Sequence, residues 1–205
     1  GLQFDIAVFT NISHDHLDYH ETFDNYILAK KKLFDMLSSD SFALINNDDN
    51  HAKTMIHHSK AKSKTFSLKS TADFKGRILE RSIDGMLLNI DSSEVWIKLV
   101  GDFNAYNILV VYSIAILLGG EKINILTKLS ELKPIEGRFQ LVKSKNGIVG
   151  IVDYAHTPDA LKNILDSINS IRDLKKQLIT VIGCGGDRDK EKRPKMARIA
   201  CEFSD

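Results

Sequence analysis

The chain has 205 residues, enough for one large domain or two small ones. Its 43% hydrophobic and 27% charged content is ordinary for a globular protein, and a formal net charge of +1 gives no electrostatic case for binding nucleic acid or a membrane. No apolar run approaches the roughly 20 residues that span a bilayer, and two cysteines are too few for a disulfide scaffold, so we expect a cytoplasmic protein.

A cluster of imidazoles and carboxylates follows the first predicted strand, residues 4–9. Residues 11–20 hold three of the seven histidines, His14, His16 and His20, together with two aspartates. The carboxyl end of a strand is where α/β enzymes place metal and phosphate chemistry. A zinc hydrolase site built from these histidines is one interpretation, although alternating imidazoles without a later HxxH or cysteine make a poor tetrahedral set.

Lys30 stands out in the next segment, residues 22–37, which has the apolar periodicity of a helix. It falls at the middle of the apolar stripe, whereas Lys31 and Lys32 are expected to point elsewhere. One interpretation is a lysine whose stem covers the core while its amine reaches water. The other is an amine whose pKa is lowered by apolar surroundings, able to take up carbon dioxide as a carbamate, an oxygen ligand suited to magnesium.

The middle of the chain predicts a mixture of strands and helices. Strands are expected at 42–46 and 64–68, with a turn-rich run at 46–50 and a helix at 51–58 between them, in which His57 and His58 face solvent. A hairpin at 78–82 and 86–90, with a strand at 95–100, predicts a small antiparallel patch. Helices are expected at 104–118 and 123–132.

Asn104 and Asn107 lie three residues apart at the start of the long helix, on one face of it. Their amides could read an adenine edge or a ribose, and Gly101 before them would let a ligand approach the backbone. The alternative is that Asn104 simply caps the helix.

Pro134 and Gly137 mark a change of rhythm, and we place a domain boundary there, with residues 1–135 before it and 136–205 after it. Strands are predicted at 139–142, 148–153 and 178–182, and helices at 157–171 and 190–203. That alternation is typical of a parallel, doubly wound unit.

Three places in this second part are candidates for ligand contact. Arg138 at the hinge could pair with a phosphate. Asp153 and His156, between a strand and a helix, could accept from a ribose hydroxyl and contact a base, unless Thr157 only caps the helix. The loop 183–190 matches neither common phosphate-loop motif, so its glycines are better interpreted as a turn that presents Arg188 to an anion, and Cys184 is a weak candidate nucleophile.

Taken in order, these motifs resemble the Mur ligases of peptidoglycan synthesis over essentially the whole chain. The match rests on residues 10–12, 15–20, 26–30, 101–107, 137–138, 153–161, 183–190 and 192–194. It implies an α/β protein containing most of a central ATP-binding domain, followed by the start of a Rossmann-like domain. The activity implied is ATP-dependent amide formation on a UDP-N-acetylmuramoyl dipeptide, through an acyl phosphate, in cell-wall synthesis and thereby in cell shape and division.

The resemblance also implies roles for single residues. Lys30 matches the carbamylated lysine of the family and His16 the histidine that binds the second of two Mg2+ ions. Asn104 and Asn107 match the pair near the adenine, and Arg138, Asp153 and His156 match contacts to ATP from the last domain. Arg188 matches the arginine that meets a carboxylate of the incoming diamino acid.

Several expectations concern what the chain lacks. The family's phosphate loop, its UDP-binding domain and its motif for selecting the diamino acid do not occur in residues 1–205. We therefore expect a monomeric fragment that is inactive by itself. We favour meso-diaminopimelate as the added amino acid, with L-lysine as the alternative, and a non-catalytic ATP-binding relative as a further one.

Overall fold

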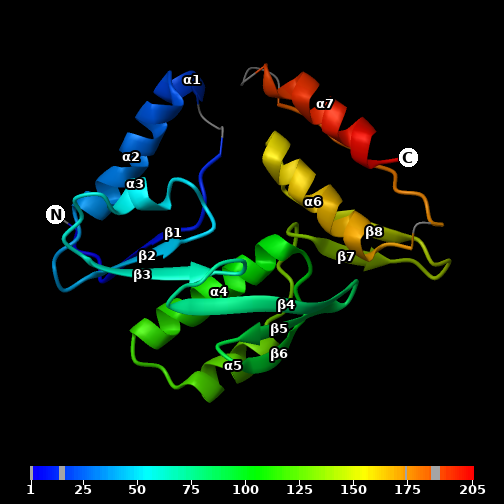
Figure 1. Ribbon diagram of the computed structural model, residues 1–205. Coiled ribbons are helices and arrows are strands. Elements are labelled where there is room, and N and C mark those ends of the chain that lie inside the picture. Colours follow the sequence, from blue (N-terminus) through cyan, green and yellow to red (C-terminus); the bar gives the residue numbers. More distant parts are fainter. Residues whose placement is uncertain (1, 14–16, 174, 186–189) are drawn as a thin grey trace.

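A six-stranded mixed sheet organises the first part of the molecule (Figure 1). The computed structural model describes residues 2–13, 17–173, 175–185 and 190–205. The strands lie in the order in which they occur along the chain. The first four are parallel to one another, and each of the last two runs antiparallel to the strand before it. They are β1 (Ile6–Phe9), β2 (Phe42–Asn46), β3 (Lys62–Ser67), β4 (Phe74–Ser82), β5 (Gly85–Ile90) and β6 (Ser93–Ile97).

Strand β4 joins the two halves of this sheet. Its first residues pair in parallel with β3, where Phe74 lies opposite Phe66, and the rest pairs antiparallel with β5. The predicted strand at 78–82 therefore begins four residues earlier than expected. Because of that extension, the predicted antiparallel patch is continuous with the parallel strands and not separate from them.

Helices cover both faces of the sheet, and the alternation of side chains in β2 shows how. Leu44 packs into a core with α4 (Asp102–Leu117) and α5 (Lys122–Glu131), whereas Ala43 and Ile45 pack with α2 (Phe23–Asp35) and α3 (Ala52–Ile56). A short helix, α1 (Leu17–His20), precedes α2. Four consecutive residues of β2, Ala43 to Asn46, are buried, so both faces of the strand are covered, which explains why its sequence has no alternation of polarity.

The C-terminal part packs two helices beside a two-stranded sheet. Strands β7 (Gln140–Lys143) and β8 (Val149–Val152) are antiparallel, and α6 (Pro158–Ile171) lies next to α7 (Lys192–Phe203). Thr157 caps α6, because its hydroxyl accepts a hydrogen bond from the Ala160 amide at 3.3 Å, which confirms the capping that the sequence offered as an alternative, and Pro158 opens the helix. The described residues contain no helix long and apolar enough to cross a membrane.

The strand predicted at 178–182 is wrong for the described chain, since no ladder forms there. The Leu178 amide donates to the Asp205 carboxylate at 2.8 Å and its carbonyl accepts from the Asp205 amide at 3.0 Å. A strand exists only with a neighbour to pair with, and β7 and β8 pair with each other across a short turn. The described residues of the C-terminal part therefore contain no parallel ladder of the kind that the predicted doubly wound unit would have.

Candidate functional site

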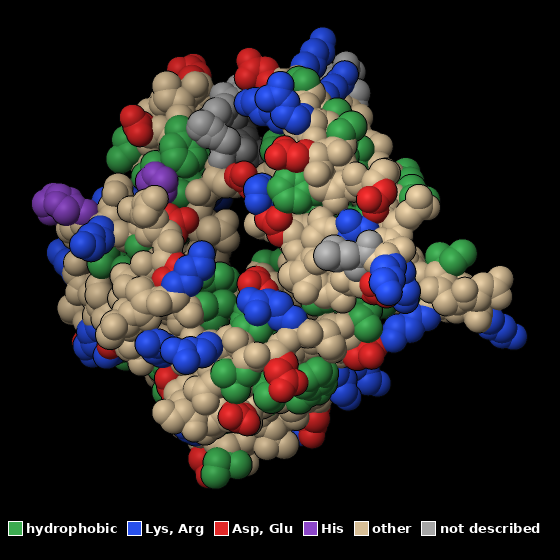
Figure 2. Space-filling view, turned by 45° about the vertical axis from the view of Figure 1, so that its right-hand side comes forward, with side chains coloured by type: hydrophobic (Ala, Val, Ile, Leu, Met, Phe, Trp, Pro, Cys, Tyr) green, Lys and Arg blue, Asp and Glu red, His purple; other side chains and the backbone are tan. Residues whose placement is uncertain are grey.

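A cleft of about 660 Å³ opens at the carboxyl ends of the three parallel strands β1, β2 and β3. Figure 2 shows a hollow between the two parts of the molecule. The volume falls in the range of small-molecule sites, and the place is where open α/β sheets bind ligands. The lining residues are Thr10, Asn11, Asn46, Asp48, Asp49, Lys69, Arg81, Asp102, Phe103, Tyr106, Asn107, Asn163, Asp166, Ser167 and Ser170.

The loops after β1 and β2 form one side of the cleft and are bonded to each other. The side-chain amide of Asn46 donates to the Thr10 carbonyl at 2.7 Å. The Asp49 carboxylate accepts from the Ile12 amide at 3.2 Å and from the His51 amide at 2.8 Å. These short polar side chains satisfy backbone groups that would otherwise be unpaired where the strands end.

Asp48 is the most heavily bonded side chain of the cleft. It accepts hydrogen bonds from the side chains of Ser67 (2.7 Å), Ser70 (3.0 Å) and Tyr106 (2.9 Å), and from the amides of Leu68 (2.9 Å) and Lys69 (3.2 Å). Burial works to raise the pKa of this carboxyl, but the hydrogen bonds outweigh burial and lower it. Burial, and then the bond to Asp48, raise the pKa of the Tyr106 hydroxyl.

The start of α4 forms a second wall. Gly101 precedes the helix with φ of 97°, and a Cβ there would lie 2.5 Å from the Phe103 ring. The expected room for a ligand at Gly101 is thus occupied by the chain's own phenyl ring. Asn104 lies inside the first turn and donates to the Val100 carbonyl at 2.8 Å, so the predicted cap at Asn104 is wrong. Asn107 lines the cleft and donates to Asn104 at 3.2 Å.

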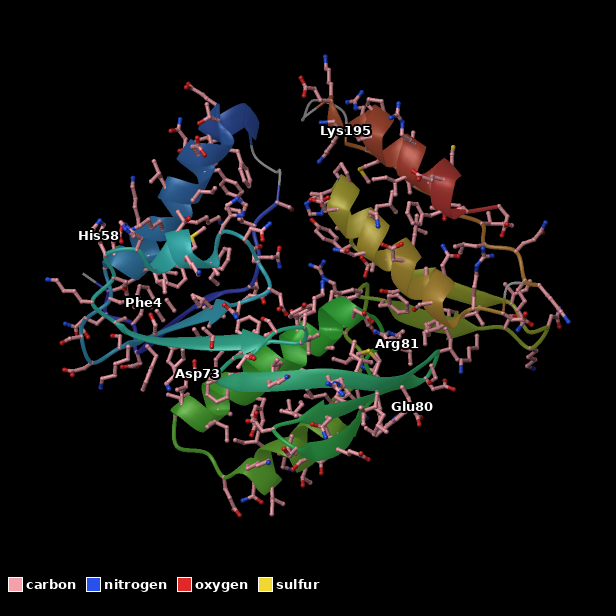
Figure 3. The ribbon with its side chains drawn as sticks, viewed as in Figure 1. Phe4, His58, Asp73, Glu80, Arg81 and Lys195 are labelled. Carbon is pink, nitrogen blue, oxygen red and sulfur yellow. The ribbon has the colours of Figure 1, made fainter. Side chains whose placement is uncertain are left out.

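An ion pair and helix α6 complete the cleft. Arg81 of β4 meets Asp102 of α4 through two parallel bonds, Nε to Oδ1 and Nη2 to Oδ2, both 2.8 Å (Figure 3 labels Arg81). This contact raises the pKa of Arg81, and burial opposes it only in part. The opposite charges of Arg81 and Asp102 therefore offset each other on this side of the cleft. Helix α6 adds polar side chains such as Asn163 and Ser170 to the lining.

Of the two interpretations of Lys30, the structure matches the one in which the amine is not buried. Lys30 is exposed, and its Nζ lies 5.4 Å from the centroid of the Tyr26 ring, while Tyr26 and Ile27 are buried. The less exposed lysine of α2 is its neighbour Lys31, which pairs with Asp35. The arrangement at Lys30 matches the interpretation in which the stem lies along apolar surface while the amine reaches water, and Lys30 is not among the described residues that line the cleft.

Two predicted site residues, His16 and Arg188, lie outside the described residues, as does His14. His20 is described: its ring packs 5.0 Å from Tyr26 and its carbonyl accepts from the Asn25 side chain. His57 and His58 are exposed, as predicted. Within residues 2–13, 17–173, 175–185 and 190–205, no three His, Cys, Asp or Glu side chains gather so as to hold a metal ion.

Arg138, Asp153 and His156 come together in the C-terminal part. The guanidinium carbon of Arg138 lies 4.5 Å from the centroid of the Tyr154 ring, and the His156 ring meets the same tyrosine at 5.1 Å. The Asp153 carboxylate accepts from the amides of Phe139 at 2.8 Å and Ala155 at 2.7 Å. Asp153 therefore fixes both the turn that carries Arg138 and the segment that carries His156.

The described part of the glycine loop is tied to α7. The Gly185 carbonyl accepts from the Arg193 guanidinium at 3.0 Å, and the Cys184 sulfur lies 3.8 Å from that of Met196. A cysteine packed against a buried methionine is a small apolar side chain. Nothing around Cys184 resembles the partner of a thiol nucleophile in the described structure.

Sequence reasoning missed most of the cleft. Asp48 and Asp49 were noted only as part of a turn, and Arg81, Asp102 and Tyr106 were not singled out. One signal could have identified the first two: adjacent aspartates that follow a mostly buried strand with one residue between, at the end where ligands bind.

Comparison with known proteins gives the same family for both parts of the chain. Residues 1–115 match the family described as Mur ligase middle domain, and residues 137–205 match the one described as Mur ligase, glutamate ligase domain. A curated protein of Cytophaga hutchinsonii, UDP-N-acetylmuramoyl-L-alanyl-D-glutamate--2,6-diaminopimelate ligase, is 53% identical over 205 residues. The match covers 100% of this chain and 42% of that protein.

Solved structures show the same fold. A structure of UDP-N-acetylmuramoyl-L-alanyl-D-glutamate--2,6-diaminopimelate ligase superposes with a TM-score of 0.69 at 35% identity, covering 98% of this chain and 42% of the other. The MurF ligase of Thermotoga maritima, solved in complex with ADP, gives 0.69 at 18% identity over 82% of this chain and 39% of that one. The predicted α/β fold is thereby confirmed, and the structure adds that its first sheet is mostly parallel.

Proposed function

The chain belongs to the Mur ligase family, and we propose that the protein of which it forms part is an ATP-dependent amide ligase of peptidoglycan synthesis. The observation that carries the proposal is 53% identity across the full 205 residues to a curated diaminopimelate ligase. The chain spans 42% of the length of that relative, so the proposal concerns the whole protein.

The proposed reaction adds meso-diaminopimelate to UDP-N-acetylmuramoyl-L-alanyl-D-glutamate. An oxygen of the glutamyl carboxylate attacks the γ-phosphorus of ATP, which forms an acyl phosphate and releases ADP. The amine of the diamino acid then attacks the acyl carbon, a tetrahedral intermediate forms, and phosphate leaves as the amide is made. The name of the relative favours diaminopimelate over L-lysine as the amino acid.

The cleft at the ends of β1, β2 and β3 is the proposed place of the nucleotide. Asn107 lines it directly, and Asn104 is hydrogen-bonded to Asn107, so the two amides are held as one pair at the start of α4. We propose that this pair meets the adenine, and that Arg138, Asp153 and His156 approach ATP from the C-terminal part. The ADP bound to a protein of the same fold supports a nucleotide here.

Magnesium is proposed from the family resemblance. The described residues hold no cluster of His, Cys, Asp or Glu that would complete a site by itself, and His16, one proposed ligand, lies outside them. Lys30 is exposed, so its proposed carbamylation rests on the family resemblance and not on apolar surroundings. Bound magnesium would neutralise the phosphates, and Arg188 is proposed to meet a carboxylate of the diamino acid.

We further propose a domain boundary between residues 135 and 136, a monomer, and a cytoplasmic location. The packing of the two parts supports the first of these. Residues 137–205 contribute almost all of one apolar core, to which the earlier part adds Val100 and Phe103.

A ligation assay of the full-length protein tests the proposed function. With ATP, magnesium and the UDP-linked dipeptide, we expect amide formation with meso-diaminopimelate and much slower formation with L-lysine, measured by mass spectrometry of the product. Rapid product with L-lysine alone would make the protein the lysine-adding homologue, and ATP binding without any product would favour the non-catalytic relative.

The role of Lys30 is tested by Lys30→Ala in the same full-length protein. Loss of the proposed oxygen ligand should lower kcat by about 100-fold or more, because charge stabilisation at a metal site is worth several kcal/mol. Lys31→Ala is the matched control, since it removes a neighbouring amine that pairs with Asp35. Full activity of Lys30→Ala without added bicarbonate would contradict the carbamate role.

A further inference from the structure

We propose that Asp48 is a positioning residue for the nucleotide: through Tyr106 it fixes the turn of α4 that carries Asn104 and Asn107, and so sets nucleotide affinity. This inference rests on the proposed function, because it assumes that the cleft binds ATP. Asp48 comes from the end of β2 and Tyr106 from α4, so the contact joins two walls of the cleft that are 58 residues apart in sequence.

The carboxylate of Asp48 is already saturated by its own protein. Its Oδ1 accepts from the hydroxyls of Ser67 and Ser70, and its Oδ2 accepts from Tyr106 and from the amides of Leu68 and Lys69. A carboxylate offers about four lone-pair positions, and five donors occupy them. Asp48 lines the cleft without spare capacity for a ligand or a metal, so it acts through the groups that it holds.

One of those donors, Tyr106, belongs to the beginning of α4 that lines the cleft, whereas the other four lie at the end of β3. Tyr106 precedes Asn107 directly, and a series of bonds runs from Asn107 to Asn104 at 3.2 Å and from Asn104 to the Val100 carbonyl at 2.8 Å. Within this series the contacts are local to α4, whereas the Tyr106 hydroxyl ties the turn to the sheet. Ser67, fully buried, anchors the other side of Asp48 and accepts from the amides of Lys69 and Ser70.

A purely stabilising role for Asp48 is the competing explanation, and the chain offers matched controls for it. Asp73 is another aspartate bonded to β3, and its donors are the amide and the hydroxyl of Thr65 and the ammonium of Lys64. It lies beside the start of β4, whereas Arg81 of the cleft lies near the end of that strand (Figure 3). Tyr112 is a buried tyrosine of the same helix, whose ring centroid lies 6.3 Å from that of Phe74. Neither residue is among the described residues that line the cleft.

The experiment compares Asp48→Asn, Tyr106→Phe and the double variant with Asp73→Asn and Tyr112→Phe, all in the full-length protein. Calorimetric titration gives the Kd for ADP, and the ligation assay separates KM for ATP from kcat. We expect Asp48→Asn to raise Kd and KM by about 10-fold and Tyr106→Phe by about 5-fold, with kcat changed less than about 2-fold, because uniform binding is lost. Tyr106→Phe keeps the ring and its packing, so it remains informative if Asp48→Asn folds poorly.

The double variant decides whether the two residues act as a unit. If the two residues share one role, the Kd of the double variant for ADP should be about that of Asp48→Asn alone. Independent roles would instead multiply the two increases in Kd. The controls should lower the melting temperature to a similar extent while leaving Kd within about 2-fold of wild type. Unchanged Kd in Tyr106→Phe, or equal loss in Asp48→Asn and Asp73→Asn, would overturn the inference. A wild-type protein that binds no ADP would instead contradict the proposed function.

Discussion

Asp73 shows at the scale of one residue how an aspartate holds a loop of this molecule. Its carboxylate accepts from the Thr65 amide at 2.9 Å, the Thr65 hydroxyl at 2.7 Å and the Lys64 ammonium at 2.8 Å. Burial works to raise the pKa of Asp73, but these donors outweigh it and lower the pKa from 3.8 to about 2. The connection between β3 and β4 is thereby closed by a side chain that needs its negative charge.

Because the carboxylate of Asp73 needs its charge, its contribution to the free energy of unfolding should depend on pH. A carboxyl whose pKa is lowered in the folded state stabilises it above the unfolded value of 3.8, and the contribution is lost as pH falls from there towards about 2. We expect Asp73→Asn to lower the free energy of unfolding by about 1 kcal/mol at about pH 6, allowing for the partial exposure of the pair. In urea titrations the difference from wild type should shrink at about pH 2.5. A difference that stays constant over this range would contradict the assignment.

Lys30 and Asn104 mark the limit of sequence reasoning at this scale. Periodicity placed Lys30 on the correct side of α2, but it does not say how far the neighbouring chain covers that side, and the amine is exposed. Asparagine is a residue type that often caps helices, so Asn104 was a candidate cap. The helix nevertheless begins at Asp102, because Gly101 can adopt the positive φ that the chain needs there. The exposure of Lys30 depends on residues distant from the pattern, whereas the start of α4 depends on the backbone conformation of Gly101.

Helix α6 is the element whose sequence signals were most complete. The helix predicted at 157–171 begins at Pro158, and Thr157 caps it, with its hydroxyl on the Ala160 amide. We expect Thr157→Ala to lower the free energy of unfolding by about 1 kcal/mol, because an amide at the helix start loses its partner. Thr157→Ser keeps the hydroxyl and should retain most of the stability in the same denaturant titration. Equal loss in both variants would assign the effect to the lost methyl group instead.

Strands were predicted less well than helices, and β4 and residues 178–182 show why. A helix is bonded within itself, so its pattern is local, whereas a strand requires a partner that the pattern does not name. Strand β4 extends to Phe74 because β3 is there to pair with it. Residues 178–182 are more apolar than β4, but Leu178 and Thr180 are bonded to Asp205 and Ser204, which follow α7.

At the scale of the whole molecule, the two parts share a core. Phe139, buried in the C-terminal part, lies 6.2 Å from the Phe103 ring of α4, and Val100 belongs to the same cluster. The N-terminal end of α4, which carries the asparagine pair, is thus packed against the second part. The walls of the cleft are held together by apolar contact as well as by the Arg81–Asp102 pair.

Phe139→Ala tests this shared core. Removing a ring that is 3% exposed should cost about 3 kcal/mol, and hydrogen exchange should speed up in α6 and at the start of α4 more than in β2. Val152→Ala, at an exposed position of β8, should change little. Uniform acceleration across the whole chain would show that the two parts unfold as one cooperative unit and not through this contact.

The sequence by itself determined the family, the fold class, nearly all helices and the hairpin, because these depend on local periodicity, turn residues and ordered motifs. Only the tertiary structure decided which side chains meet. It joined Asp48 to Tyr106 and Arg81 to Asp102, left Lys30 exposed, and gathered Arg138 and His156 around Tyr154. The physical reason is that hydrogen bonds and burial depend on distances in space, and residues far apart in sequence carry no local pattern of their contact.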